Sequence, residues 1–189
     1  MSLEVFRATI KYCEDGLCIG GGEPTVHPDF ETILLEAIAT CYEPGGVFIV
    51  TNGKNTLRAM MLARLARSGV IGCELSRDQY HEEIDEAVVS AFECGVPSGC
   101  EAHDARGIRT VRPENAIEGG RCDWGDDTRC VCEGPLIDPF GDVHICGCQG
   151  ARILGNIMDP EYSLGDFPWG DEECGRTGVT TDSTGQTLL

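Results

Sequence analysis

Short apolar runs and helical repeats of apolar residues alternate along the first part of the chain. Residues 17–20 predict a short strand, and residues 29–42 follow with apolar positions at helical spacing. Residues 47–50 form a wholly apolar strand of the kind that is buried in parallel sheets. The helix over 29–42 places its apolar residues on one face: Phe30, Ile33, Leu34, Ala37, Ile38 and Cys41.

The same alternation continues beyond this first unit. A helix is predicted over 56–68 with Asn55 as its N-cap, then a strand over 70–75, a helix over 83–93 and a strand over 107–111. Strands that alternate with helices through short connections indicate a parallel sheet covered by helices. A complete eight-unit barrel needs about 250 residues, so we expect an α/β fold that is either a partial (β/α) barrel or a doubly wound sheet.

Beyond Pro113 the periodic pattern gives way to glycine, cysteine and aspartate. We therefore expect three regions: the α/β part at 1–112, an irregular cysteine-rich extension at 113–160, and an irregular tail at 161–189.

Charge and hydropathy exclude some partners. The net charge is −18, from 32 acidic and 14 basic residues, and such a surface repels the phosphates of nucleic acids and of anionic membranes. No apolar run reaches the roughly 18 residues of a membrane helix, and the N-terminus has no signal-peptide pattern. We expect a cytoplasmic protein with no membrane or nucleic-acid partner.

Cysteine is abundant and unevenly placed. Of 12 cysteines, five lie within residues 122–148. Two Cys-x-Cys pairs there, Cys130 with Cys132 and Cys146 with Cys148, are separated by a turn-rich segment and could converge on one tetrahedral metal site. Thiolates ligate iron and zinc alike, so the spacing does not identify the metal. Free thiols or disulfides are the alternative.

The segment Gly20-Gly21-Gly22-Glu23-Pro24 lies between the first strand and the first helix. Glycines let a backbone approach a ligand closely, and a carboxylate can hold an ammonium group. The structural alternative is a tight turn in which Glu23 is only an acid at a helix N-terminus.

The order of strand, Gly-Gly-Glu-Pro and helix resembles the second βα unit of radical S-adenosylmethionine (radical SAM) enzymes. The resemblance implies that Gly21, Gly22, Glu23 and Pro24 hold the amino group of S-adenosylmethionine. Residues 47–53 look like the family's third strand, which closes on Thr-Asn-Gly, and this brings Asn52 into the site; a plain turn residue is the alternative.

Residues 73–81 are similar to the edge of the family's fourth strand, where polar side chains face the ribose and carboxylate of the cofactor. The resemblance thus adds Ser76 and Arg77 to the cofactor site. Exposure to solvent is the alternative for both side chains.

Gly141 and Cys146 form a Gly-x4-Cys motif that resembles the opening of a SPASM or twitch extension. Such extensions bind auxiliary iron–sulfur clusters, and the resemblance implies a [4Fe–4S] cluster, with zinc as the alternative metal. By association the extension also suggests a peptide or protein substrate. The implied ligands are Cys130, Cys132, Cys146 and Cys148, with Cys122 or Cys174 as substitutes.

The family's cluster-binding motif CxxxCxxC is absent from these residues. We therefore expect a fragment or natural remnant of a radical SAM enzyme, without the first strand and cluster loop and unable to cleave the cofactor. The alternative function is a non-catalytic metal-binding interaction module on the same scaffold. A truncated sheet would also expose an unpaired edge, which favours self-association.

Overall fold

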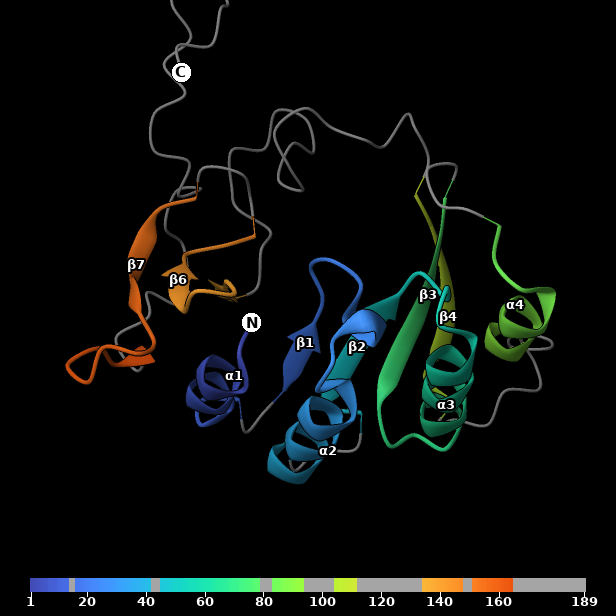
Figure 1. The fold of residues 1–189 in the computed structure, drawn as a ribbon, viewed down its shortest axis with the longest axis horizontal. Helices are drawn as coiled ribbons and strands as arrows, with labels where there is room; N and C mark the ends of the chain where they lie inside the picture. Colours follow the sequence, from blue (N-terminus) through green and yellow to red (C-terminus); the bar gives the residue numbers. More distant parts are fainter. Residues whose placement is uncertain are drawn as a thin grey trace, which may run out of the picture. The chain divides into compact units, whose positions relative to one another are not determined.

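The computed structural model describes residues 1–13, 16–41, 45–78, 83–93, 104–111, 134–147 and 151–164. The chain forms two compact units (Figure 1). The larger unit is Ile10–Asn115, and the smaller unit combines Met1–Thr9 with Ala116–Leu189. The boundary expected at residue 112 lies outside the described residues.

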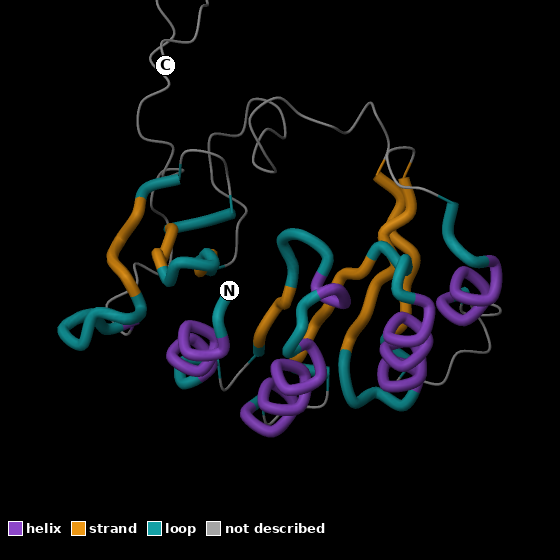
Figure 2. Tube along the Cα trace, in the orientation of Figure 1, coloured by secondary structure: helices purple, strands orange, loops and turns teal. Residues whose placement is uncertain are grey.

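The larger unit is built on a parallel four-stranded sheet in the order β1-β2-β3-β4. Its successive strands are joined by helices, so each connection is a crossover of the βαβ type (Figure 2). The predicted α/β class with a parallel sheet is thereby confirmed. The elements are β1 (Leu17–Ile19), η1 (Pro24–Val26), α2 (Phe30–Thr40), β2 (Val47–Thr51), α3 (Thr56–Arg67), β3 (Gly72–Asp78), α4 (Glu86–Phe92) and β4 (Arg106–Val111).

Helix α3 shows how local sequence sets these boundaries. The Asn55 side chain accepts a hydrogen bond from the Arg58 N–H at 3.3 Å, which confirms the predicted N-cap. After the helix, Gly69 has a φ of +73°, a backbone conformation that favours glycine and ends the helix.

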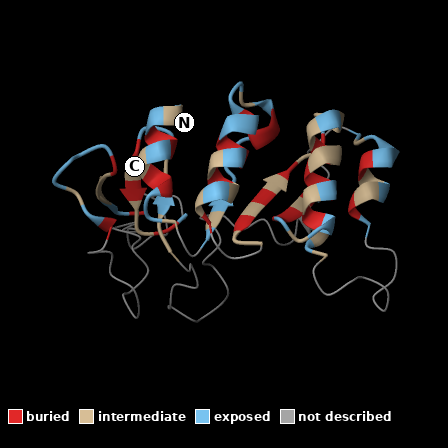
Figure 3. Cartoon of the chain, turned by 90° about the horizontal axis from the view of Figure 1, so that it is seen from below, coloured by how far each residue is buried: buried red, intermediate tan, exposed pale blue. Residues whose placement is uncertain are grey.

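The core of the larger unit lies between one face of the sheet and the helices. On β2, Val47 and Ile49 are at most 1% exposed, whereas Phe48 and Val50 are half-buried. The prediction of a strand buried on both faces is therefore wrong for Phe48 and Val50, because helices cover only one face of the sheet among the described residues (Figure 3). The buried helix residues that complete this core are Phe30, Ile33, Leu34, Ala37, Ala59, Leu62, Ala63, Ala66, Val88 and Phe92.

The smaller unit contains most of helix α1 (Leu3–Ile10) and a three-stranded antiparallel sheet. Its strands, in the order β5-β6-β7, are β5 (Leu136–Ile137), β6 (Asp142–His144) and β7 (Ile153–Asn156). A small apolar cluster of Val5, Val143, Ile157 and Leu164 holds the helix to the sheet. Helix α1 and strands β5 and β7 were not predicted as elements from the sequence, whereas the alternation of Val143, His144 and Ile145 does predict a strand at β6.

Within the parts of the chain that the structure describes, no helix is long and apolar enough to cross a membrane.

Candidate functional site

The segment from Gly20 to His27, which we call the glycine loop, follows β1. It lies at the carboxyl ends of the parallel strands, where ligands bind in open α/β folds. Gly21 has a φ of +83°, so the backbone itself favours glycine there. Gly20 and Gly22 do not have such a φ, and a Cβ added at either would meet no atom within 4 Å. All three residues are exposed. The backbone conformation therefore favours glycine at position 21, whereas the fold imposes no steric requirement for glycine at positions 20 and 22.

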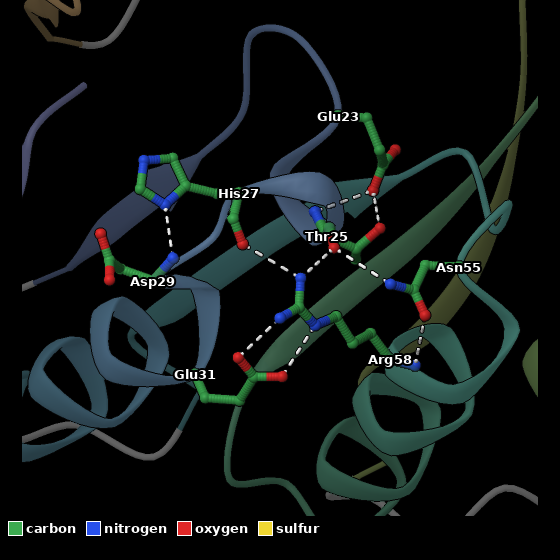
Figure 4. Close-up of polar contacts among 7 residues, drawn as sticks. All are labelled: Glu23, Thr25, His27, Asp29, Glu31, Asn55 and Arg58. Carbon is green, nitrogen blue, oxygen red and sulfur yellow. Dashed lines mark hydrogen bonds and ion pairs between the residues drawn. The ribbon is translucent and has the colours of Figure 1, made fainter.

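Glu23 ties this loop to the end of β2. Its Oε1 accepts hydrogen bonds from the Thr25 N–H (3.0 Å), the Thr25 hydroxyl (2.5 Å) and the Thr51 hydroxyl (2.8 Å). Its Oε2 accepts one from the Asn52 N–H at 2.6 Å. Figure 4 shows the contacts with Thr25. A carboxylate has about four acceptor positions, two on each oxygen, so with respect to the described residues Oε2 keeps one position for a further donor.

Glu23 therefore has the structural role that was the alternative to cofactor binding, as the N-cap of η1 and as a bridge to β2. Pro24 occupies the first position of η1 and is buried. This arrangement fixes the direction of the Glu23 carboxylate before any ligand arrives.

Arg58, on the first turn of α3, holds the far side of the same loop. Its Nη1 donates to the carbonyl oxygens of Thr25 (2.5 Å) and His27 (3.0 Å). Its Nε and Nη2 donate to the two oxygens of Glu31 at 2.7 and 2.8 Å (Figure 4). Its guanidinium also lies 5.3 Å from the centre of the Phe30 ring. Sequence reasoning missed Arg58, because its spacing marks it only as one more polar residue on a helix.

Asn55 adds to this attachment, since its Nδ2 donates to the Thr25 carbonyl at 3.2 Å while its Oδ1 caps α3. His27 is a turn residue: its Nδ1 accepts a hydrogen bond from the Asp29 N–H at 3.0 Å. The loop is thus held by β2 on one side and by α3 on the other.

The remaining residues predicted for the cofactor site are less closely joined to the loop. The Asn52 N–H contacts Glu23, but the Asn52 side chain turns back to accept from the Lys54 N–H at 3.0 Å, as in the turn alternative. Ser76 lies on β3 and is 6% exposed, whereas Arg77 is exposed. The structure therefore brings Glu23 and Asn52 into contact and places Ser76 on the adjacent strand.

Of the four cysteines predicted as metal ligands, Cys146 is described and is 1% exposed. Cys130, Cys132 and Cys148 lie outside the described residues, as do the substitutes Cys122 and Cys174. Among the described residues, no three histidine, cysteine or carboxylate side chains are grouped as metal ligands would be.

The glycines of the smaller unit differ from those of the loop. Gly141 begins the Gly-x4-Cys motif with a φ of +92°, and a Cβ there would lie 3.0 Å from Asn156 Oδ1. A Cβ at Gly155 would overlap the Tyr162 ring. The fold itself accounts for glycine at both positions.

Three cysteines of the larger unit are poor nucleophiles, because only the thiolate is reactive. Burial raises the pKa of Cys73 to about 12 and that of Cys13 to about 11. Burial also raises the pKa of Cys41, whose thiol donates to the Cys13 carbonyl at 3.1 Å. These side chains act as small apolar groups rather than as reactive centres.

No protein-family model matches this chain, and no match to it is found among curated proteins or solved structures.

Proposed function

We propose that the larger unit is a partial (β/α) barrel of the radical SAM type, and that it binds S-adenosylmethionine at the edge formed by Gly20–Glu23. The observation that carries the proposal is the pair Gly20 and Gly22, where glycine occurs without any steric demand from the described fold. Open space beside a backbone is what a ligand needs for close approach. Because these residues lack CxxxCxxC, the proposal is one of binding and not of cofactor cleavage.

Glu23 supports the same proposal through its charge and its fixed position. One oxygen is saturated by Thr25 and Thr51, and among the described residues the other accepts only the Asn52 N–H. An ammonium group that donates to the remaining position of Oε2 would form a charge-assisted hydrogen bond with an acceptor that needs no rearrangement. The α-ammonium of S-adenosylmethionine is such a group.

The test is a calorimetric titration of the metal-free chain with S-adenosylmethionine, comparing the unchanged protein with Gly22→Val. A Cβ added at position 22 meets no protein atom within 4 Å and Gly22 is exposed, so we expect the thermal midpoint to stay constant. We expect the dissociation constant to rise about tenfold or more, because the valine side chain occupies the space where the ligand approaches.

Gly147→Val is the matched control. Gly147 is also exposed, has no left-handed φ, and has no atom within 4 Å of an added Cβ. It should leave the affinity for S-adenosylmethionine unchanged. The proposal fails if the unchanged protein does not bind the compound, or if Gly22→Val binds it as well as the control does.

A second candidate function is a non-catalytic module that binds zinc or an iron–sulfur cluster through the cysteine-rich extension. The observation in its favour is Cys146, which lies two residues after β6 and is 1% exposed. Metal ligation couples to folding, so zinc or iron added to the metal-free chain should raise its thermal midpoint. A thermal midpoint that neither zinc nor iron changes would exclude this function.

A further inference from the structure

The face of the sheet opposite the helices carries polar side chains near its carboxyl edge. Leu75 points to the helix side, since a Cβ on Gly53 would lie 2.7 Å from Leu75 Cδ1 and 3.3 Å from Val88 of α4. Side chains alternate along a strand, so Ser76 and its register partner Arg109 lie on the opposite face, which we call the open face because no described helix covers it (Figure 3). Glu74 and Gly107 form the preceding row of the same face.

Side chains of this face lean over its glycines. Phe48 covers Gly72, where an added Cβ would lie 2.7 Å from the phenylalanine ring. In the next row Glu74 covers Gly107, with its Cγ 3.2 Å from an added Cβ. The open face therefore has a packed apolar end and a polar end, and Arg109 is at the polar end.

Arg109 differs from the other half-buried arginines that the structure describes. Arg58 donates to two carbonyls and to Glu31, and Arg106 donates to both oxygens of Asp104 and to the Ala91 carbonyl. Within the described parts of the chain, the Arg109 Nε is buried and has no hydrogen-bond partner. A buried donor without a partner costs stability, and here it occurs in a chain with 32 acidic residues.

From this contrast we propose that Arg109, with the Ser76 hydroxyl beside it, binds the carboxylate of a ligand on the open face of the sheet. A guanidinium pairs with a carboxylate through parallel hydrogen bonds, and the Nε–H is one of the donors in that arrangement. Glu74 and the net charge of −18 both oppose negative charge at this face. A singly charged carboxylate therefore suits the site better than a doubly charged phosphate.

The carboxylate does not belong to the amino-acid head that we place at Glu23. Glu23 is bonded to the end of β2, and Arg109 lies on β4, the second strand along. Two strand spacings are about 10 Å, whereas the ammonium and carboxylate of an α-amino acid are attached to one carbon. The ligand at Arg109 is therefore a separate molecule, which makes a carboxylate-bearing compound the substrate class. Only this last step rests on the proposed function.

The experiment follows the Nε–Hε signals of the arginines by nitrogen–proton NMR during a titration with sodium acetate at constant ionic strength. We expect the Arg109 signal, assigned by its loss in Arg109→Met, to shift and reach saturation. The signals of Arg58 and Arg106 should stay in place, because their Nε–H groups already bond to carboxylates. An Arg109 signal that does not move, or that drifts without saturation as exposed arginines do, overturns the proposal.

Two further measurements separate the alternatives. Arg109→Met should keep or raise the urea midpoint, since it removes a buried donor that has no partner; a lower midpoint would show a structural role and overturn the assignment. S-adenosylmethionine added to the acetate-saturated protein should leave the Arg109 signal unchanged. Displacement of acetate would overturn the assignment to a second molecule, while failure of S-adenosylmethionine to bind would affect the proposed function alone.

Discussion

The attachment of the glycine loop by Arg58 gives the sharpest prediction about stability. We consider Arg58→Met, which keeps a long unbranched side chain with good helix propensity and removes the guanidinium. The arginine side chain is 22% exposed, and its Nη1 is shared by the carbonyls of Thr25 and His27. The change therefore removes charge-assisted hydrogen bonds from a half-buried position.

The magnitude follows from what each partner retains. Hydrogen bonds to charged groups contribute about 1.5–3 kcal/mol, and a cation over an aromatic ring such as Phe30 about 0.5–1 kcal/mol. The Thr25 carbonyl keeps its bond from Asn55, and the His27 carbonyl keeps the Phe30 N–H, so neither is left unsatisfied. We leave the exposed Glu31 out of the sum and expect a loss of about 2–4 kcal/mol.

The assay is urea unfolding monitored by circular dichroism, with the slope checked for constancy so that a shifted midpoint reports stability. Arg64→Met is the matched control, because Arg64 lies on the same helix, is exposed, and makes no side-chain hydrogen bond that the structure records. A loss below about 0.5 kcal/mol in Arg58→Met, or a loss equal to that of the control, would refute this account of the loop.

Two further substitutions test other parts of the larger unit. Gly53→Ala should cost about 2–4 kcal/mol, since Gly53 has a φ of +74° and an added Cβ would lie 2.7 Å from Leu75. Gly45→Ala has a similar φ of +77° but meets no atom, so equal losses in thermal unfolding would argue against the clash. Hydrogen bonds from Arg106 lower the pKa of Asp104 below its ordinary value of 3.8. The Asp104 carboxylate therefore stabilises the fold at pH values above 3.8, and this stabilisation is lost as the pH falls through the native pKa. Asp104→Asn should therefore lower stability at pH 7 and flatten its decline below about pH 4, and an unchanged pH profile in urea unfolding would contradict this.

The parallel sheet could be predicted because each of its strands and helices is indicated by residues that are close together in the sequence. Residues 47–50 are apolar, Asn55 is a suitable cap, and Gly69 ends a helical repeat. Helix α1 was missed, although the shorter helix α4 was predicted.

The candidate site was predicted only in part, because some of its residues take their roles from contacts that form only in the folded chain. Gly20–Glu23 form a local motif, so sequence order was enough to find them. Arg58 and Arg109 owe their roles to tertiary structure: the first to carbonyls some 30 positions away in the chain, the second to strand register. Neither relation leaves a signal in a single sequence.

The double attachment of the glycine loop limits how far the motif can be moved. A transplant of residues 17–41 into another protein would carry the glycines and Glu23 but would leave behind Thr51 and Arg58, which fix the loop from β2 and α3. The smallest portable unit is therefore 17–67, a whole β-α-β-α segment. For protein engineering, the Gly-Gly-Glu-Pro motif alone is therefore not a transferable unit.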